Sequence, residues 1–398
     1  MAPLKNTSGR SFGKLLGVNR SLDLANDTNS GASKRGQLNS KYIGARSRGN
    51  EGLQICEATG GTTSTPGDGY KYHTYNSSST FVVTTPGKIE YLLIGGGAGC
   101  GGHAGGGGGG AGGVRTNLSG HPLAAPDFIV SIGTYTVTIG SGGPGAPSSG
   151  DGPTGPGGNP GSKGGDTEFY LPTASYPGAD FLRGAGGGGG GGGNPGPTTV
   201  PTTSLGGSGG GGSAFTPHDG GVTISDPNHP EAQGHNGGSG NPNSIAGGGG
   251  AGAGSNGFDA PGTPGEMAGG RGGYGIGLLL AQIGGPTMGP TLGNAGPPTG
   301  LGEGYPGGPS AVRWFAGGGG GGTHAGGSGT EGGGGGGQPS AENAWAGAGY
   351  GTPFGSTNQI HAEANQGGGG GGAGGKTGQY AAAGGNGGSG FVLIRYPA

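Results

Sequence analysis

Residues 88–113 read KIEYLLIGGGAGCGGHAGGGGGGAGG, a β-strand pattern that runs directly into glycine tracts. The first seven residues alternate, which places Ile89, Tyr91 and Leu93 on one face of a pleat. A second apolar strand pattern, FVLIRY, stands at residues 391–396. A buried strand at the end of a disordered tail would lack partners, so we expect the two strands to pair. The glycine tracts between them would then be insertions into one β-domain that is held at both ends.

Further strand patterns surround the first one. Residues 70–75 (YKYHTY) alternate around a pleat, residues 80–84 are β-branched and aromatic, and Pro86-Gly87 marks a turn. Residues 127–140 continue the alternation, with Phe128, Val130 and Ile132 on one face, followed after a break at Gly133 by Tyr135, Val137 and Ile139. The sequence therefore predicts an all-β fold, with a small antiparallel β-sandwich at residues 51–140 and little or no α-helix.

Composition alone allows a different reading, because 122 of the 398 residues are glycine and 30 are proline. So much glycine and proline without a fixed period is typical of low complexity or disorder. Collagen is excluded because its triple helix needs glycine at every third position only. This chain instead has unbroken glycine runs at 105–110, 186–193 and 367–372.

Glycine tracts can nevertheless order when several lie side by side. A polyproline II helix has about three residues per turn and no internal hydrogen bonds, so its backbone groups point outward. Glycine has no side chain to hold such helices apart, so neighbouring helices can bond laterally. Ordering one residue costs roughly 1–2 kcal/mol and one net hydrogen bond returns about 0.5–1.5 kcal/mol, so only a tract bonded on several sides orders. We therefore expect a polyglycine II bundle with variable loops at residues 141–388, closed by a C-terminal strand at residues 389–398.

Charge is distributed unevenly along the chain. Residues 1–50 carry nine basic and two acidic residues, a balance of +7, whereas the whole chain has a formal charge of −2. This pattern predicts a basic arm that docks on an acidic partner. Nucleic acid is one candidate, but a groove on another protein fits better because the arm has almost no aromatic residues to stack on bases. The basic residues expected to dock are Arg10, Lys14, Arg20, Lys34 and Arg35.

Cysteine and hydropathy patterns bear on the compartment. Two cysteines, Cys56 and Cys100, are too few for a disulfide framework. No apolar run has the length of a secretory signal or a transmembrane helix. We expect assembly in a reducing cytoplasm and no membrane insertion.

Three segments carry a family resemblance. Residues 88–113, TYTVTIGSGG at 134–143 and GGNGGSGFVLIRYP at 384–397 resemble the glycine-rich domain of phage tail-fibre and other virion proteins, particularly those of marine cyanophages. The resemblance covers about residues 68–398 and is compositional in the middle. It implies stacked polyglycine II helices that hold variable loops for a host receptor. The arm differs from the long attachment regions of many tail fibres. The resemblance is therefore compatible with a position of the protein either on the tail or on the head of the virion.

The resemblance implies a function of binding and structure. We expect a structural bacteriophage virion protein, a tail fibre or adhesin, which the arm attaches to other virion proteins and whose loops bind a host cell-surface glycan or outer-membrane protein. The alternative is a head fibre or capsid decoration protein without a receptor role. Either a single chain or a homotrimer is compatible with the sequence.

Aromatic residues in the loops are the candidate receptor contacts, because exposed aromatic rings stack on sugars and anchor interfaces. Packing against the bundle is the alternative role for each of them, so the loop set is a firmer prediction than any one residue. The candidates are Phe169, Tyr170, Tyr176, Phe181, Tyr274, Tyr305, Trp345, Tyr350 and Phe354.

No pattern predicts catalysis or a cofactor. Residues 370–377 (GGGAGGKT) match the phosphate-binding loop in letters, but neither a strand before them nor a helix after them is indicated. Histidines between His218 and His235 could in principle hold a metal, although a polar loop with fixed proline turns explains them better. No nucleophile, base and orienting acid cluster together. We expect a protein that is not an enzyme and binds no nucleotide.

Overall fold

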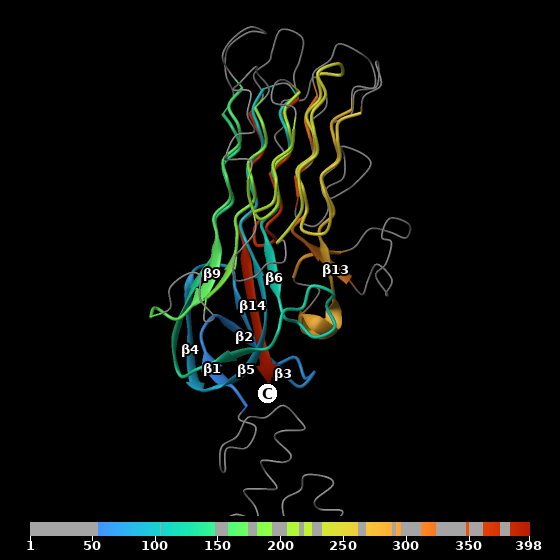
Figure 1. Ribbon diagram of the computed structural model, residues 1–398. Coiled ribbons are helices and arrows are strands. Elements are labelled where there is room, and N and C mark those ends of the chain that lie inside the picture. The colour runs from blue at the N-terminus through green and yellow to red at the C-terminus, as the bar shows by residue number, and fades with distance from the viewer. Residues whose placement is uncertain are drawn as a thin grey trace, which may run out of the picture.

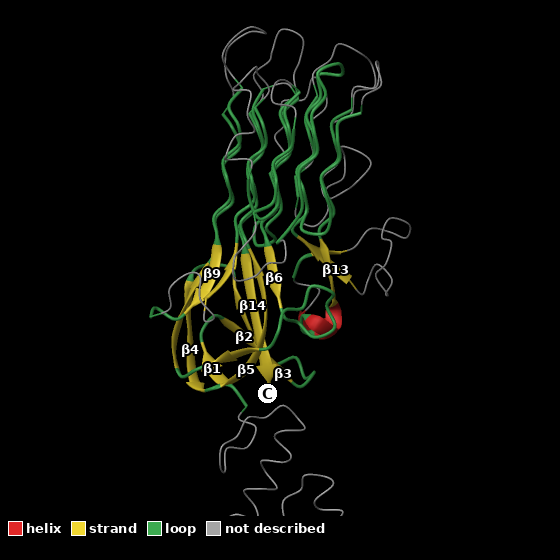
Figure 2. Ribbon diagram, viewed as in Figure 1, coloured by secondary structure: helices red, strands yellow, loops and turns green. Residues whose placement is uncertain are grey.

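The chain folds, in a computed structural model, into three antiparallel sheets that together form a base. Glycine segments lie side by side and extend beyond one end of this base (Figure 1, Figure 2). Helix within the described residues is confined to two short turns, η2 (Leu280–Gln282) and α4 (Gly285–Met288). The predicted all-β fold is therefore confirmed. The structure describes residues 55–103, 105–147, 158–173, 181–192, 205–214, 219–224, 233–261, 268–288, 292–295, 312–323, 348–349, 361–374 and 383–398.

The strand order defines the three sheets. The first sheet has the order β1-β4-β8-β9-β10, and the second has the order β2-β3-β14-β5-β6 with β7 beside the start of β5. A smaller third sheet has the order β11-β13-β12. The strands are β1 (Glu57–Thr59), β2 (Thr62–Ser64), β3 (Tyr70–Tyr75), β4 (Ser79–Thr85), β5 (Gly87–Ile94), β6 (Val114–Thr116), β7 (Phe128–Val130), β8 (Gly133–Thr138), β9 (Thr167–Tyr170), β10 (Phe181–Gly184), β11 (Ile276–Leu279), β12 (Asn294–Ala295), β13 (Val312–Phe315) and β14 (Phe391–Pro397).

Strand β14 occupies the centre of the second sheet. It runs antiparallel to β5, with Phe391 opposite Ile94 and Ile394 opposite Tyr91. Its other edge pairs antiparallel with β3, where Ile394 lies opposite His73. The predicted pairing of the two apolar strands is confirmed, so the sequence that contains the glycine tracts starts and finishes in adjacent strands of one sheet.

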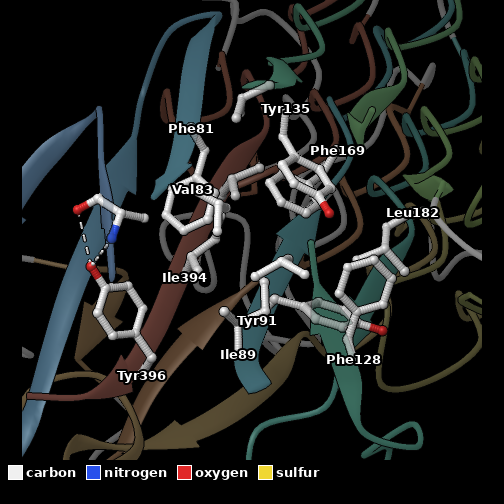
Figure 3. Close-up of a cluster of buried hydrophobic side chains, with 14 of the residues drawn as sticks. Phe81, Val83, Ile89, Tyr91, Phe128, Tyr135, Phe169, Leu182, Ile394 and Tyr396 are labelled. Atoms are coloured by element: carbon white, nitrogen blue, oxygen red, sulfur yellow. Dashed lines mark hydrogen bonds between the residues drawn. The ribbon is translucent and has the colours of Figure 1, made fainter. Parts of the chain in front are cut away.

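The first hydrophobic core lies between the first and second sheets (Figure 3). Phe81, Tyr135 and Phe169 come from the first sheet, and the rings of Tyr135 and Phe169 stack with their centroids 4.8 Å apart. Ile89 and Tyr91 meet them from the second sheet. Burying each such side chain contributes roughly 1.5–3 kcal/mol, so this cluster joins the two sheets into a β-sandwich.

A second hydrophobic core covers the opposite face of the second sheet. Leu92, Ile94 and Leu393 point to this side and pack against Ile276 and Phe315 of the third sheet. The second sheet is therefore the middle of three layers. A strand buried on both faces needs apolar residues at successive positions, which explains the apolar runs at 91–94 of β5 and 391–394 of β14.

The structure corrects one inward position and extends the base. Ile132 was predicted to share a face with Phe128 and Val130, which are buried, but it is 67% exposed, because β7 ends at Val130 and β8 starts only at Gly133. The alternation therefore does not continue through the turn between these strands. The base also recruits strands β9 to β13 from the glycine-rich part of the sequence, beyond the region 51–140 in which we expected the β-sandwich.

The glycine segments form one hydrogen-bonded array, which we call the glycine bundle. Its central segment is 105–113, in which successive residues from Gly107 to Gly113 donate their N–H groups to three different neighbours, which are 185–191, 248–251 and 367–370. The same segment accepts hydrogen bonds from three others, which are 95–101, 208–214 and 319–322. Each neighbour is bonded at every third residue of the central segment. Gly107, Gly110 and Gly113, for example, all donate to segment 185–191. The hydrogen bonds of this segment therefore repeat every three residues and reach six neighbours.

The bundle requires glycine at its centre because neighbouring backbones are in contact. A Cβ atom on Gly108 would lie 2.1 Å from the carbonyl oxygen of Gly319, and one on Gly107 would lie 2.1 Å from that of Gly211. Real Cβ contacts essentially never fall below 3.0 Å. The outer parts of the bundle are segments 140–147, 158–165, 219–224, 233–240, 254–261, 268–275 and 383–390.

Candidate binding surfaces

The predicted receptor contacts on β9 and β10 lie mostly inside the base. Phe169 is fully buried and Phe181 is 8% exposed. Tyr170 is half-buried and stacks on Phe181 with the ring centroids 4.7 Å apart. Phe169 and Phe181 therefore pack in the base and do not face a receptor, because their strands belong to the first sheet.

One predicted contact, Tyr274, lies at the surface of the glycine bundle. It is half-buried, and its ring meets the ring of Phe258 edge to face at 5.9 Å. The guanidinium of Arg271 lies over the Phe258 ring, 4.3 Å from its centroid. The sequence did not single out Phe258 or Arg271. The other predicted contacts lie outside the described residues, namely Tyr176, Tyr305, Trp345, Tyr350 and Phe354.

The predicted docking residues also lie outside the described residues, namely Arg10, Lys14, Arg20, Lys34 and Arg35. The same holds for His218, whereas His235 is half-buried and burial lowers its pKa. In the part of the chain that the structure describes, no three His, Cys, Asp or Glu side chains are grouped so that they could hold a metal ion. The prediction of a docking arm therefore stays a prediction.

Polar side chains close the edge of the bundle beside Tyr274. Asn256 Oδ1 accepts a hydrogen bond from the N–H of Asn236 at 3.1 Å, and Asp259 Oδ1 accepts one from the N–H of Ser239 at 2.6 Å. Inside the bundle such N–H groups donate to carbonyl groups of a neighbouring segment. At this edge the two side-chain oxygens accept the hydrogen bonds instead. We call the surface formed by Asn256, Phe258, Asp259, Arg271 and Tyr274 the aromatic flank.

A three-residue spacing in the sequence marks this flank. Asn256 precedes Asp259 by three residues, and Arg271 precedes Tyr274 by three with glycine at both positions between them. In a helix with three residues per turn, such residues lie on one face. Composition does not reveal this signal, because it lies only in the spacing of a few side chains among glycines.

A comparison with known protein families gives a match that begins and ends in strands of the second sheet. The family model of the glycine-rich domain matches residues 74–397, from within β3 to the end of β14. The chain belongs to the glycine-rich domain family. In this chain the glycine-rich domain therefore includes most of the base as well as the bundle. No curated protein matched the chain.

A buried ionic network ties the layers of the glycine-rich domain together. Arg395 Nε donates to Glu90 Oε2 at 2.7 Å, and its Nη1 donates to the carbonyl oxygen of Gln282 at 3.0 Å. The Arg395 side chain is 4% exposed. Burial opposes its charge, but hydrogen bonds to Tyr72 and Glu90 outweigh burial and raise the pKa of Arg395. The network joins β14, β5 and the η2 turn, so its role is to hold the third sheet on the second.

A second buried contact closes the opposite side of the base. His73 Nδ1 lies 2.7 Å from the carbonyl oxygen of Gly60 and must donate to it, which leaves Nε2 to accept from the Tyr396 hydroxyl at 2.9 Å. The same hydroxyl accepts the N–H of Ala58 at 3.1 Å (Figure 3). Burial lowers the pKa of His73 and raises that of Tyr396 to about 12. Both side chains are therefore neutral near pH 7 and serve packing.

Residues 370–377 of the glycine-rich domain, whose sequence matches the phosphate-binding loop motif, lie partly within the bundle. The N–H of Gly370 donates to the carbonyl oxygen of Ala98, and that of Gly372 donates to the carbonyl oxygen of Gly320. These donors are thus directed at backbone, whereas a phosphate loop directs them at a ligand. Among the described residues, no helix combines the length and the apolar character that crossing a membrane requires.

Proposed function

We propose that this protein is a structural component of a bacteriophage virion, a tail fibre or adhesin, whose glycine segments are polyglycine II helices. The observation that supports the helix type is the three-residue repeat of hydrogen bonds around segment 105–113. A chain bonded to six neighbours cannot bend alone, so the bundle acts as a stiff spacer. A stiff spacer suits a fibre, which must hold a contact surface away from its particle.

The arrangement of the ends carries the proposal. The described chain starts beside β1, at the side of the base that faces away from the glycine bundle (Figure 1). Residues 1–50 precede this point in the sequence and carry the basic side chains, so we infer that they attach the base to another virion protein. The bundle and its connecting loops would then face outward, toward a host cell-surface glycan or outer-membrane protein. This role is binding and needs no catalysis.

Labelling of intact particles tests the location. Antibody against the bundle, viewed by electron microscopy, should mark the tail of the particle, and particles made with a chain lacking residues 1–50 should not be marked. Marking of the head instead would favour a capsid decoration protein. The absence of label from every particle would refute a virion role.

Exchange of loops tests receptor binding. Residues 296–311 and 324–347 should be exchanged with those of a related phage that infects another host, because these limits leave β12, β13 and the central bundle intact. A change of host range supports an adhesin. An unchanged host range, together with purified protein that does not compete with phage for host cells, would leave only a structural role.

A further inference from the structure

The aromatic flank is a rigid surface, and this makes it suitable for recognition. Its backbone is fixed by bonds to neighbouring segments: the N–H of Phe258 donates to Arg271 and the N–H of Gly249 donates to the carbonyl oxygen of Phe258. The N–H of Tyr274 donates to Ser255 Oγ at 2.8 Å. Side chains on a fixed backbone lose little further conformational entropy when they bind a ligand.

The aromatic flank combines three kinds of chemical group. The half-buried rings of Phe258 and Tyr274 offer apolar surface, and the guanidinium of Arg271 is held against the first ring. Asn256 and Asp259 are exposed, and each uses an oxygen to cap a backbone N–H. The Asn256 amide nitrogen makes no hydrogen bond to a described residue, so two donor hydrogens remain for a ligand. The second carboxylate oxygen of Asp259 is an acceptor three residues further along the segment, about 9 Å away at a rise of about 3.1 Å per residue.

We propose that the aromatic flank binds neutral carbohydrate on the host surface, a proposal that rests on the adhesin role proposed above. The C–H face of a sugar ring packs on an aromatic ring, as apolar surface does. Sugar hydroxyl groups both donate and accept, so an oligosaccharide lying along the segment can accept from the Asn256 amide and donate to the Asp259 carboxylate about 9 Å further on. The charges of Arg271 and Asp259 balance, so the flank favours a neutral ligand over an acidic one.

An exchange of one atom separates binding from folding. Asn256→Asp keeps the oxygen that caps the N–H of Asn236 but replaces the amide donor with an acceptor. Asn386→Asp is the matched control, because Asn386 Oδ1 caps the N–H of Gly145 at 2.8 Å in the same manner. The segment that contains Asn386 bonds to none of residues 233–274 among the described residues.

Binding of the full chain should be measured on immobilised neutral hexose and N-acetylhexosamine oligosaccharides, and on host cells treated with periodate or with protease. We expect Asn256→Asp to weaken binding by about tenfold, which corresponds to about 1.4 kcal/mol, and Asn386→Asp to leave it unchanged. Phe258→Leu should weaken binding as well. Periodate, which cleaves neighbouring diols, should abolish cell binding, whereas protease should not.

Other results separate this inference from the proposed function. Equal binding by wild type, Asn256→Asp and Phe258→Leu would place the site elsewhere and leave the adhesin role intact. Loss of cell binding after protease alone would show a protein receptor and overturn the carbohydrate assignment. The adhesin role itself would be refuted if wild-type protein bound neither oligosaccharides nor cells and antibody labelling found the protein on no particle.

Discussion

Substitution of the central glycine Gly108 by alanine tests how closely the bundle is packed. The added Cβ would lie 2.1 Å from the carbonyl oxygen of Gly319 and 2.9 Å from that of Gly320, whereas ordinary contacts begin at 3.4 Å. The two backbones must therefore separate by about 1.3 Å. Gly319 accepts from Gly250 at 2.8 Å and donates to Gly109 at 2.9 Å, so this movement breaks both hydrogen bonds.

The expected cost of Gly108→Ala follows from these broken bonds. A buried group left without its partner costs about 1–3 kcal/mol, so two broken bonds and the crowding itself give about 4 kcal/mol. This is a large part of the roughly 5–15 kcal/mol by which proteins are stable. Urea unfolding followed by tryptophan fluorescence measures the loss of free energy of unfolding.

Gly67→Ala is the matched control for this prediction. Gly67 has φ +94° and nothing within 4 Å of an added Cβ, so alanine should cost about 1 kcal/mol there, from backbone strain alone. If Gly108→Ala costs no more than Gly67→Ala, the bundle is not packed as described.

Three further predictions concern buried side chains. Arg395→Met should destabilise the fold by about 3–5 kcal/mol in urea unfolding, because Glu90 would stay buried without its partner; a cost under 1 kcal/mol would contradict the network. Burial lowers the pKa of folded His73 below the value of about 6.5 in the unfolded chain, so protons bind preferentially to the unfolded state and stability should fall as pH decreases from about 6.5. His73→Gln should reduce this loss between pH 7 and pH 5, and an unchanged pH profile would exclude His73 as a contributor. Burial raises the pKa of the Cys56 and Cys100 thiols to about 12, so a disulfide reagent at pH 8 should modify neither thiol until urea unfolds the chain, and rapid labelling of the folded protein would show exposed thiols.

Much of the second sheet could be predicted because its strands are long and apolar. The pattern of Ile89, Tyr91 and Leu93 identified one buried face, and the matching run at residues 391–396 identified the partner strand. Neither pattern showed that Leu92 and Leu393 are buried as well, because that depends on a third sheet that covers the other face. A continuous apolar run predicts burial on both faces only when a covering layer can be identified.

The short strands, and the partners of the central glycine segment, could not be predicted from the sequence. Strands β9, β10, β11 and β13 have four residues each, too few to establish an alternation among glycine and proline. Phe169 and Phe181 consequently looked like loop aromatics, although their strands complete the first sheet. The neighbours of the central segment come from six separate parts of the chain, all but 95–101 distant in sequence, and one glycine tract carries no information that distinguishes them.

Hydrogen exchange measured by mass spectrometry tests most directly whether the glycine segments are ordered. Each N–H from Gly106 to Gly113 donates to a backbone carbonyl within the fold, so peptides covering this segment should exchange as slowly as those covering β14. Protection should extend through residues that have no side chain at all. Exchange of residues 106–113 at the rate of an unstructured chain, while β14 stays protected, would contradict the bundle and return these tracts to disorder.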